Sequence, residues 1–257
     1  MEKIPIMRIE NIAKKFGGLT AVDNVNYQIN EGERLGIIGP NGAGKTTFFN
    51  LITGLLSSDH GNITYMGKDI TKLPSYKRVE KGIARTFQLV SVLNSLRVID
   101  NLVLANVRFG INYKRKSKLF FENINRSDII DNCFTDLKIM HLEKKAFTMT
   151  DELSYGDKRK LELAIVLSLK PKILLLDEPF AGLNDLEIIE IIKIIKGMKE
   201  DFSLVIIEHK ISQILDLVDK LAVMHEGKLI ANAEPKTIIS DPFIKEIYWG
   251  KEKGFED

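Results

Sequence analysis

The stretch Gly39-Pro40-Asn41-Gly42-Ala43-Gly44-Lys45-Thr46-Thr47 decides how the rest of the chain can be interpreted. It fits the pattern G-x-x-x-x-G-K-[ST], a loop that holds phosphate groups when it joins a strand to a helix. Residues 34–38 are a short apolar run typical of a buried strand, and residues 46–56 carry apolar side chains at helical spacing. Strand, loop and helix are all indicated, so we predict a nucleotide-binding site here.

The chemistry of this loop follows from its glycines and from the helix behind it. Glycine permits conformations that turn successive N–H groups inward, and the positive end of the helix dipole faces the same point. We expect Lys45 on the β- and γ-phosphates, Thr46 on Mg²⁺ and Thr47 near the α-phosphate. The predicted nucleotide-binding residues are Gly39, Pro40, Asn41, Gly42, Ala43, Gly44, Lys45, Thr46 and Thr47.

Composition is that of an ordinary globular protein. The 257 residues are 44% hydrophobic and 28% charged, enough for one large domain or a core with an inserted lobe. The net charge of +2 demands no nucleic-acid partner, and no apolar run approaches the roughly 20 residues that span a bilayer. Residues 1–6 lack the apolar core of a signal peptide, and the single cysteine, Cys133, fits a reducing compartment. We expect a soluble cytosolic protein.

The N-terminal third predicts a small antiparallel sheet beside the nucleotide site. Residues 6–12, 25–29 and 62–66 have the composition of strands. Phe16 lies in the loop between the first two strands, where its ring could stack on adenine or plug the small sheet. A short strand within residues 82–88 ends on the polar Gln88.

Residues 89 to about 165 change in character. Helical runs cover 97–107 and 128–140, separated by a basic stretch at 113–118 that could contact anionic lipid or RNA, or could be a solvated loop. A polar loop at 151–157 leads into a helix through Leu169, with Ser154 as its predicted N-cap. Its inward face carries Leu161, Ala164, Ile165 and Leu169, and the other face carries mostly Lys158, Arg159, Lys160 and Glu162.

Two acids follow the apolar run at 173–176, which suits a central parallel strand covered on both faces. Asp177 and Glu178 therefore come at the carboxyl end of the strand, where open α/β sheets bind ligands. We expect Asp177 to hold Mg²⁺ through its water shell and Glu178 to orient or deprotonate the attacking water. An acidic helix-capping turn is the structural alternative.

A second such strand, residues 203–207, ends in Glu208 and His209. We expect His209 to face the same crevice as Glu178 and to hydrogen-bond the γ-phosphate. Residues 221–231 predict a hairpin, and the tail from 241 to 257 holds the only tryptophan, Trp249. This tail either docks on the domain or forms a contact surface.

Taken in order, these features resemble an ABC-type ATPase domain over essentially the whole chain. They are the phosphate loop, Gln88, Leu153-Ser154-Tyr155-Gly156, Asp177-Glu178 and His209, of which the Ser154-Tyr155-Gly156 signature is the most specific. Within the family, residues 82–88, 153–156, 159–162, 177–184 and 247–250 resemble the ATP-binding subunits of branched-chain amino-acid importers.

The resemblance implies an α/β P-loop NTPase fold. A parallel-sheet core would carry a small antiparallel β subdomain and an inserted α-helical subdomain. The whole chain, 1–257, would be one ABC ATPase domain, with the core at 1–88 and 165–235, the helical subdomain at 89–164 and a tail at 236–257.

The resemblance also assigns roles to particular residues. Phe16 would stack on adenine and Val22 would join the nucleotide contacts. Catalysis falls to Glu178, His209 and Gln88, and the magnesium site to Thr46, Gln88 and Asp177. Ser154, Tyr155 and Gly156 would serve the ATP held by the other subunit, and residues 181–184 would cross between subunits.

The signature departs from the common pattern at two positions. Tyr155 replaces a glycine, which fits the amino-acid importer branch, and Asp157 replaces a glutamine. Because Asp157 adds negative charge near a triphosphate, its side chain is not expected to contact ATP.

The implied function is ATP-driven transport at the cytoplasmic face of a membrane. Two copies, or this chain and a second ABC ATPase, would close around two MgATP and drive two membrane permease subunits fed by a substrate-binding protein. Branched-chain amino acids are the expected cargo, with urea, other amino acids or lipopolysaccharide as alternatives. A non-transport ATPase acting on ribosomes or DNA is a further alternative, although such proteins usually carry two cassettes or long coiled-coil insertions.

Overall fold

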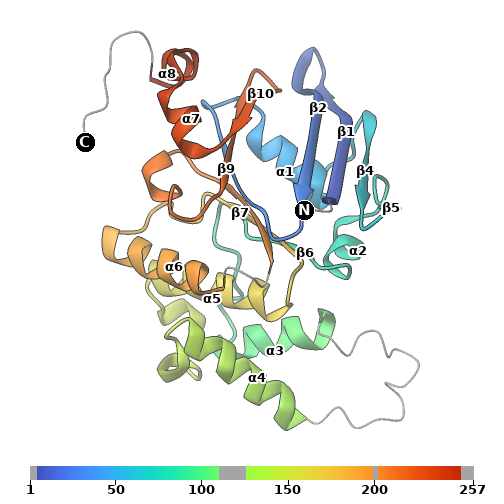
Figure 1. Cartoon of the computed structure of the whole chain (residues 1–257). Helices are drawn as coiled ribbons and strands as arrows, with labels where there is room; N and C mark the ends of the chain where they lie inside the picture. The colour runs from blue at the N-terminus through green and yellow to red at the C-terminus, as the bar shows by residue number, and fades with distance from the viewer. Residues whose placement is uncertain (1–4, 110–125, 199–201, 250–257) are drawn as a thin grey trace.

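A computed structural model describes residues 5–109, 126–198 and 202–249. The chain forms two sheets and a helical lobe (Figure 1). The larger sheet has the strand order β10-β9-β3-β8-β7-β6, and the smaller has the order β2-β1-β4-β5. The basic stretch at 113–118 lies outside the described residues.

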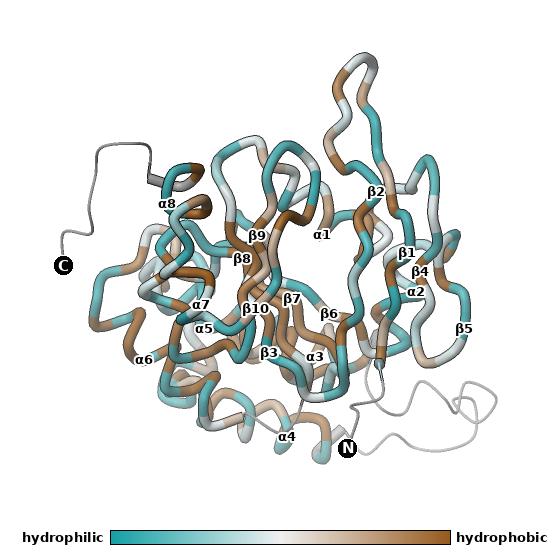
Figure 2. Tube along the Cα trace, turned by 45° about the horizontal axis from the view of Figure 1, so that its top comes forward, coloured by the Kyte–Doolittle hydropathy of each residue, from teal (hydrophilic) through white to brown (hydrophobic). Residues whose placement is uncertain are grey.

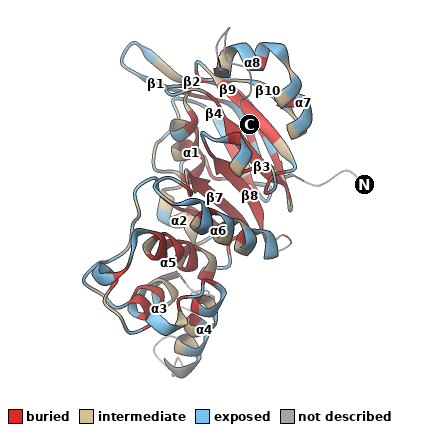
Figure 3. Cartoon of the chain, turned by 90° about the vertical axis from the view of Figure 1, so that its left-hand side faces the viewer, coloured by how far each residue is buried: buried red, intermediate tan, exposed pale blue. Residues whose placement is uncertain are grey.

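The larger sheet is parallel except at one edge. Its strands are β3 (Arg34–Ile38), β6 (Ile83–Arg85), β7 (Ile173–Asp177), β8 (Ser203–Ile207), β9 (Lys220–His225) and β10 (Lys228–Ala233). Only β10 pairs antiparallel, as the hairpin predicted from residues 221–231. Strands β3, β7 and β8 are buried throughout, as expected of strands covered on both faces (Figure 3).

Alternate residues of the central strands enter two different cores. Leu174 and Leu176 of β7 pack on the side of the helical lobe, whereas Ile173 and Leu175 pack toward the smaller sheet. The hydropathy view shows these central strands as the most continuous apolar part of the chain (Figure 2).

The smaller sheet contains longer strands than the sequence predicted. It consists of β1 (Pro5–Phe16), β2 (Leu19–Asn30), β4 (His60–Tyr65) and β5 (Lys68–Asp69). Phe16 is therefore the last residue of β1 and not part of a wide loop, because Gly17 and Gly18 alone connect the two strands. The side-chain carboxylate of Asp59 binds Lys14 Nζ at 2.8 Å and the Lys15 amide at 2.7 Å, which holds this end of β1 in place.

Helices cover the sheets and build the lobe. They are α1 (Lys45–Thr53), α2 (Ser75–Val79), α3 (Val98–Phe109), α4 (Arg126–Ile139), α5 (Tyr155–Ser168), α6 (Asp185–Gly197), α7 (Pro235–Ser240) and α8 (Pro242–Trp249). Short 3-10 turns occur at Glu143–Lys145, Thr150–Glu152 and Ile211–Gln213. The fold is the predicted P-loop NTPase fold, with helices α3 and α4 below the larger sheet in Figure 1.

The charged face of α5 differs from the prediction. Arg159, Lys160 and Glu162 are buried, and Lys158 is half-buried. The three buried charges have ionic partners inside the protein, which is the condition for burying them.

The C-terminal helices pack against the core. Ile238 of α7 and Ile244 of α8 are both buried in the larger cluster of apolar residues. The side chain of Trp249 and residues 250–257 lie outside the described part. None of the helices in the described ranges is both long and apolar enough to cross a bilayer.

Candidate nucleotide site

The phosphate loop runs from the end of β3 to the start of α1 in a conformation that only glycine accommodates. Gly39 has a φ of 154°, and a Cβ there would lie 2.1 Å from the Met224 carbonyl oxygen. Gly44 has a φ of 97°, and its Cβ would lie 2.2 Å from the Ala21 carbonyl oxygen. The loop therefore approaches the backbone of two other elements too closely for any side chain.

Lys45, the first residue of α1, curls back over this loop. Its Nζ donates to the carbonyl oxygens of Gly39 at 2.7 Å and Pro40 at 3.0 Å. Burial lowers the pKa of Lys45, while Glu178 and Asp177 oppose that shift. A desolvated ammonium group beside a helix N-terminus favours an anion at this point.

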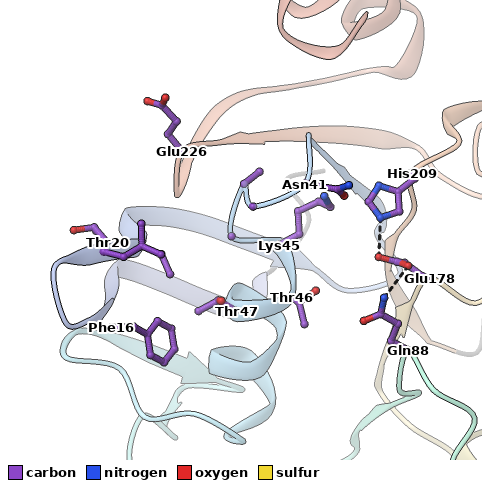
Figure 4. A pocket seen from close by; sticks show the side chains of 15 residues that line it. Phe16, Thr20, Asn41, Lys45, Thr46, Thr47, Gln88, Glu178, His209 and Glu226 are labelled. Atoms are coloured by element: carbon purple, nitrogen blue, oxygen red, sulfur yellow. Dashed lines mark hydrogen bonds and ion pairs between the residues drawn. The ribbon is translucent and has the colours of Figure 1, made fainter.

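A cavity of about 700 Å³ opens beside the loop, a usual size for a small-molecule site. Among the residues predicted for the site, it is lined by Phe16, Asn41, Gly42, Ala43, Gly44, Lys45, Thr46, Thr47, Gln88, Glu178 and His209. Figure 4 shows Phe16 at one end of this cavity and Gln88, Glu178 and His209 at the other. Phe16 is 46% exposed, so it does not plug the small sheet.

Four lining residues were missed from the sequence, namely Leu19, Thr20, Ala21 and Glu226. They come from the β1–β2 hairpin and the β9–β10 turn, which no motif identifies.

Val22 was expected to contact the nucleotide, and the structure corrects this. Its side chain is fully buried in the apolar core beneath the smaller sheet and does not line the cavity. Successive strand residues point to opposite faces, so Ala21 lines the cavity in its place.

Glu178 forms the centre of a polar cluster at the far end of the cavity. Its Oε1 lies 2.8 Å from His209 Nε2, and its Oε2 accepts from Gln88 Nε2 at 3.2 Å. The Glu178 backbone has a φ of 48°, a left-handed conformation that residues other than glycine adopt only at an energetic cost. Three segments far apart in the sequence thus meet at one carboxylate.

Asp177 lies behind Glu178 and is only 1% exposed. Arg85 Nη2 binds its Oδ2 at 2.9 Å, and Arg85 Nη1 also donates to Asn50 Oδ1 at 2.7 Å, so Arg85 joins α1 to β7. Burial raises the pKa of Asp177, and the guanidinium of Arg85 opposes that shift. Within the described residues the buried Oδ1 has no hydrogen-bond partner, which leaves one carboxylate oxygen for a hard cation or its water. Arg85 was not predicted as a site residue, because no motif in the sequence singles it out.

The signature residues lie away from this cavity. The Ser154 Oγ accepts from the Asp157 amide at 3.2 Å, so Ser154 is the N-cap of α5 as predicted. The Tyr155 ring lies against Gly182, where an added Cβ would be 3.0 Å from Tyr155 Cε1. Asp157 forms ion pairs with Lys145 and Lys160. None of Ser154, Tyr155 and Gly156 lines the cavity.

A glycine loop between the parallel strand β3 and a helix, with acids at the end of the parallel strand β7 two places along the same sheet, defines a P-loop nucleotide hydrolase. Comparison with known families narrows this class, because the family described as "ABC transporter" matches residues 22–181. The chain belongs to the ABC transporter family, as an ATPase subunit that binds and hydrolyses ATP.

Individual relatives include two different transporter ATPases. The branched-chain amino acid transport protein LivG of Salmonella typhimurium is 33% identical, over 96% of this chain and 98% of that protein. The lipopolysaccharide export protein LptB of Escherichia coli is also 33% identical, over 95% of this chain and 96% of that protein. The ADP conformation of the ABC cassette MJ1267 superposes with a TM-score of 0.84 at 33% identity, covering 96% of this chain and 100% of that one.

Proposed function

We propose that this chain hydrolyses ATP at the interface of two ATPase subunits and so drives a membrane importer for branched-chain amino acids. The observation that carries the catalytic part is the meeting of Gln88, Glu178 and His209 at the end of the phosphate cavity.

The nucleotide extends along the cavity from Phe16 to Glu178. Phe16 offers an exposed ring for adenine at one end, and the loop amides with Lys45 take the phosphates. The γ-phosphate then lies between Lys45 and the cluster around Glu178.

Hydrolysis requires a base or an orienting group for water, and Glu178 is suited to it. Its carboxylate is held by His209 and Gln88, so its direction is fixed before water arrives. His209 contacts the γ-phosphate from the other side and links it to Glu178.

Magnesium fits the oxygen donors that the chain provides. Thr46, the free Oδ1 of Asp177 and the amide oxygen of Gln88 would hold the ion directly or through its water shell. When bound, Mg²⁺ neutralises phosphate charge that develops during hydrolysis.

A second subunit is needed because the signature is separated from the cavity of its own chain. Ser154 and Tyr155 are exposed at the start of α5, where a helix N-terminus can meet the γ-phosphate of another chain. Residues 181–184 would cross between the subunits. The partner is a second copy or a second ABC ATPase.

Membrane permease subunits are the second class of partner. Phe87, Leu89 and Leu93 are 40%, 81% and 49% exposed, in the segment that follows β6. Apolar side chains grouped around Gln88 offer a docking surface at the γ-phosphate sensor. The chain would then lie on the cytoplasmic face of the membrane as a peripheral subunit.

The cargo is the least determined part of the proposal, because LivG and LptB are equally similar to this chain. The resemblance of residues 82–88 and 177–184 to the amino-acid importer branch favours branched-chain amino acids. Lipopolysaccharide export is the alternative that the LptB relatives favour.

The test is to purify the tagged full-length chain from native membranes in mild detergent and to identify its partners. Two very hydrophobic subunits, a second ATPase and turnover stimulated by a leucine-loaded binding protein are expected. Permease partners without leucine stimulation would contradict the cargo, and recovery with ribosomal or DNA-repair proteins instead would contradict transport.

A further inference from the structure

Two oppositely charged residues on α5, Arg159 and Glu162, have no role in the chemistry above. Arg159 is 0% exposed and Glu162 is 3% exposed, and Arg159 Nη1 lies 2.7 Å from Glu162 Oε2. Burying such a pair is costly unless further hydrogen bonds satisfy both groups, so their remaining contacts are informative.

The pair holds the main chain on both sides of Gln88. Arg159 donates to the carbonyl oxygens of Phe87 at 2.9 Å and Gln88 at 3.1 Å. Glu162 Oε1 accepts from the amides of Phe87 at 3.1 Å and Ser91 at 3.4 Å. Both backbone groups of Phe87 are therefore bound by this one ion pair.

The same guanidinium also reaches Glu178. Arg159 Nη2 donates to the Glu178 carbonyl oxygen at 3.3 Å. Arg159 thus contacts the backbones of the two residues whose side chains meet at 3.2 Å in the cavity. Its position sets the separation of Gln88 from Glu178.

Helix α5 connects this contact to the signature. Ser154 precedes Arg159 by five residues, or about 8 Å of helix rise. A displacement of the N-terminus of α5 is therefore transmitted to Arg159, because the two are joined by the hydrogen-bonded backbone of the helix.

We propose that Arg159 and Glu162 position Gln88 and Glu178 and, through α5, couple the ATP site of each subunit to the site that its Ser154 serves in the dimer. The coupling rests on the proposed two-subunit function. The positioning rests on the contacts within this chain. When Ser154 engages the nucleotide of the partner, α5 sets Gln88 and Glu178 for hydrolysis in its own subunit.

Conservative substitutions test the pair. Arg159→Lys keeps the charge but loses the planar fork that reaches three carbonyl oxygens, and Glu162→Gln keeps the shape but loses the charge. Lys160→Met is the matched control, because Lys160 is also buried on α5 in ion pairs but bonds to Asp157 and Glu190 and not to residues 87–91.

The measurements are MgATP binding by the isolated chain, the thermal midpoint, and steady-state hydrolysis as a function of ATP concentration. For Arg159→Lys and Glu162→Gln, we expect Kd and KM within about threefold of the unaltered chain, kcat lower by about tenfold or more, and a Hill coefficient falling toward 1. Lys160→Met should lower the thermal midpoint while kcat and the Hill coefficient stay within about twofold.

Unchanged kcat and Hill coefficient in Arg159→Lys would overturn the inference. So would a loss of kcat that Lys160→Met reproduces at equal loss of stability, since the role would then be structural. If the unaltered chain hydrolyses ATP without cooperativity, the coupling between two copies of this chain fails, whereas a loss of kcat in Arg159→Lys would still support the positioning role.

Discussion

At the scale of single residues, the buried Asp177 and the half-buried Asp136 show how surroundings decide what a carboxylate can do. Asp177 has Arg85 at 2.9 Å, which partly offsets its burial and keeps one oxygen oriented. Asp136 of α4 lies near Cys133 and Lys170, and burial raises its pKa to about 6 despite the attraction of Lys170. The first carboxylate is suited to a cation, whereas the second only costs stability when ionised.

This difference predicts a pH-dependent effect of Asp136→Asn. The pKa of Asp136 is about 6 in the folded chain and about 4 when unfolded, so the folded state loses stability as pH rises through this window. The neutral variant escapes that loss. We expect its thermal midpoint to exceed that of the unaltered chain at pH 8 by a few degrees, on the order of 1 kcal/mol after allowance for solvent near the group.

Thermal unfolding at pH 5 and pH 8 checks this prediction. The gain should be smaller at pH 5, where the group is mostly protonated in the folded chain. An equal change at both pH values would show that the substitution acts through packing.

At the scale of secondary structure, strands were predicted most accurately where both faces of the strand are buried, because nearly every residue there is apolar. The run at 203–207 was predicted as a strand and is β8, because a strand covered on both sides is apolar throughout. Strands β1 and β2 were predicted too short. Nothing in the sequence around Lys14 and Lys15 indicates that β1 continues through them. Asp59, more than 40 residues away, holds them in the sheet.

The α5 helix shows a second limit of sequence interpretation. Helical periodicity separated Leu161 from Arg159 and Glu162, yet it could not show that residues 87–91 cover the charged face. Arg85 was missed for the same reason, because its partner Asp177 is 92 residues away. The phosphate loop and the acids at the end of β7 were found because their chemistry resides in local motifs.

The start of α5 carries the prediction that belongs to this scale. Ser154→Ala removes the N-cap hydroxyl, which costs about 1 kcal/mol, and removes the group proposed to face the second nucleotide. We expect hydrolysis to fall by about tenfold or more while the isolated chain binds ATP with unchanged Kd, because Ser154 does not line its own cavity.

Nucleotide titration of the isolated chain and steady-state hydrolysis separate the two effects. Ser154→Thr, which keeps the capping hydroxyl, serves as the control and should restore most of the helix stability. A large loss of ATP binding in Ser154→Ala would instead place Ser154 in the site of its own subunit.

At the scale of the whole molecule, the proposed function gives each chain two half-sites, the cavity and the signature. The P-loop and the cluster around Glu178 line the cavity, whereas Ser154, Tyr155 and Gly156 lie outside it. On this proposal, ATP contributes to the interface between two subunits, and its hydrolysis removes that contribution. Opening and closing of such a dimer is a rigid-body change that a permease can follow.

Glu178→Gln tests this arrangement because it separates closure from hydrolysis. The amide keeps the shape of the side chain and its contact with His209. It cannot take a proton from water, and unlike the carboxylate it places no negative charge close to the γ-phosphate. We expect MgATP to remain bound, kcat to fall by about 100-fold or more, and the mass in solution to rise from the 29.1 kDa of one chain to twice that value when MgATP is added.

Analytical ultracentrifugation with MgATP and with MgADP gives the measurement, and the double variant with Ser154→Ala is the control that should stay monomeric. Normal turnover would remove Glu178 from catalysis. A slow variant that stays monomeric with MgATP would keep the catalytic role and reject a site shared by two copies of this chain.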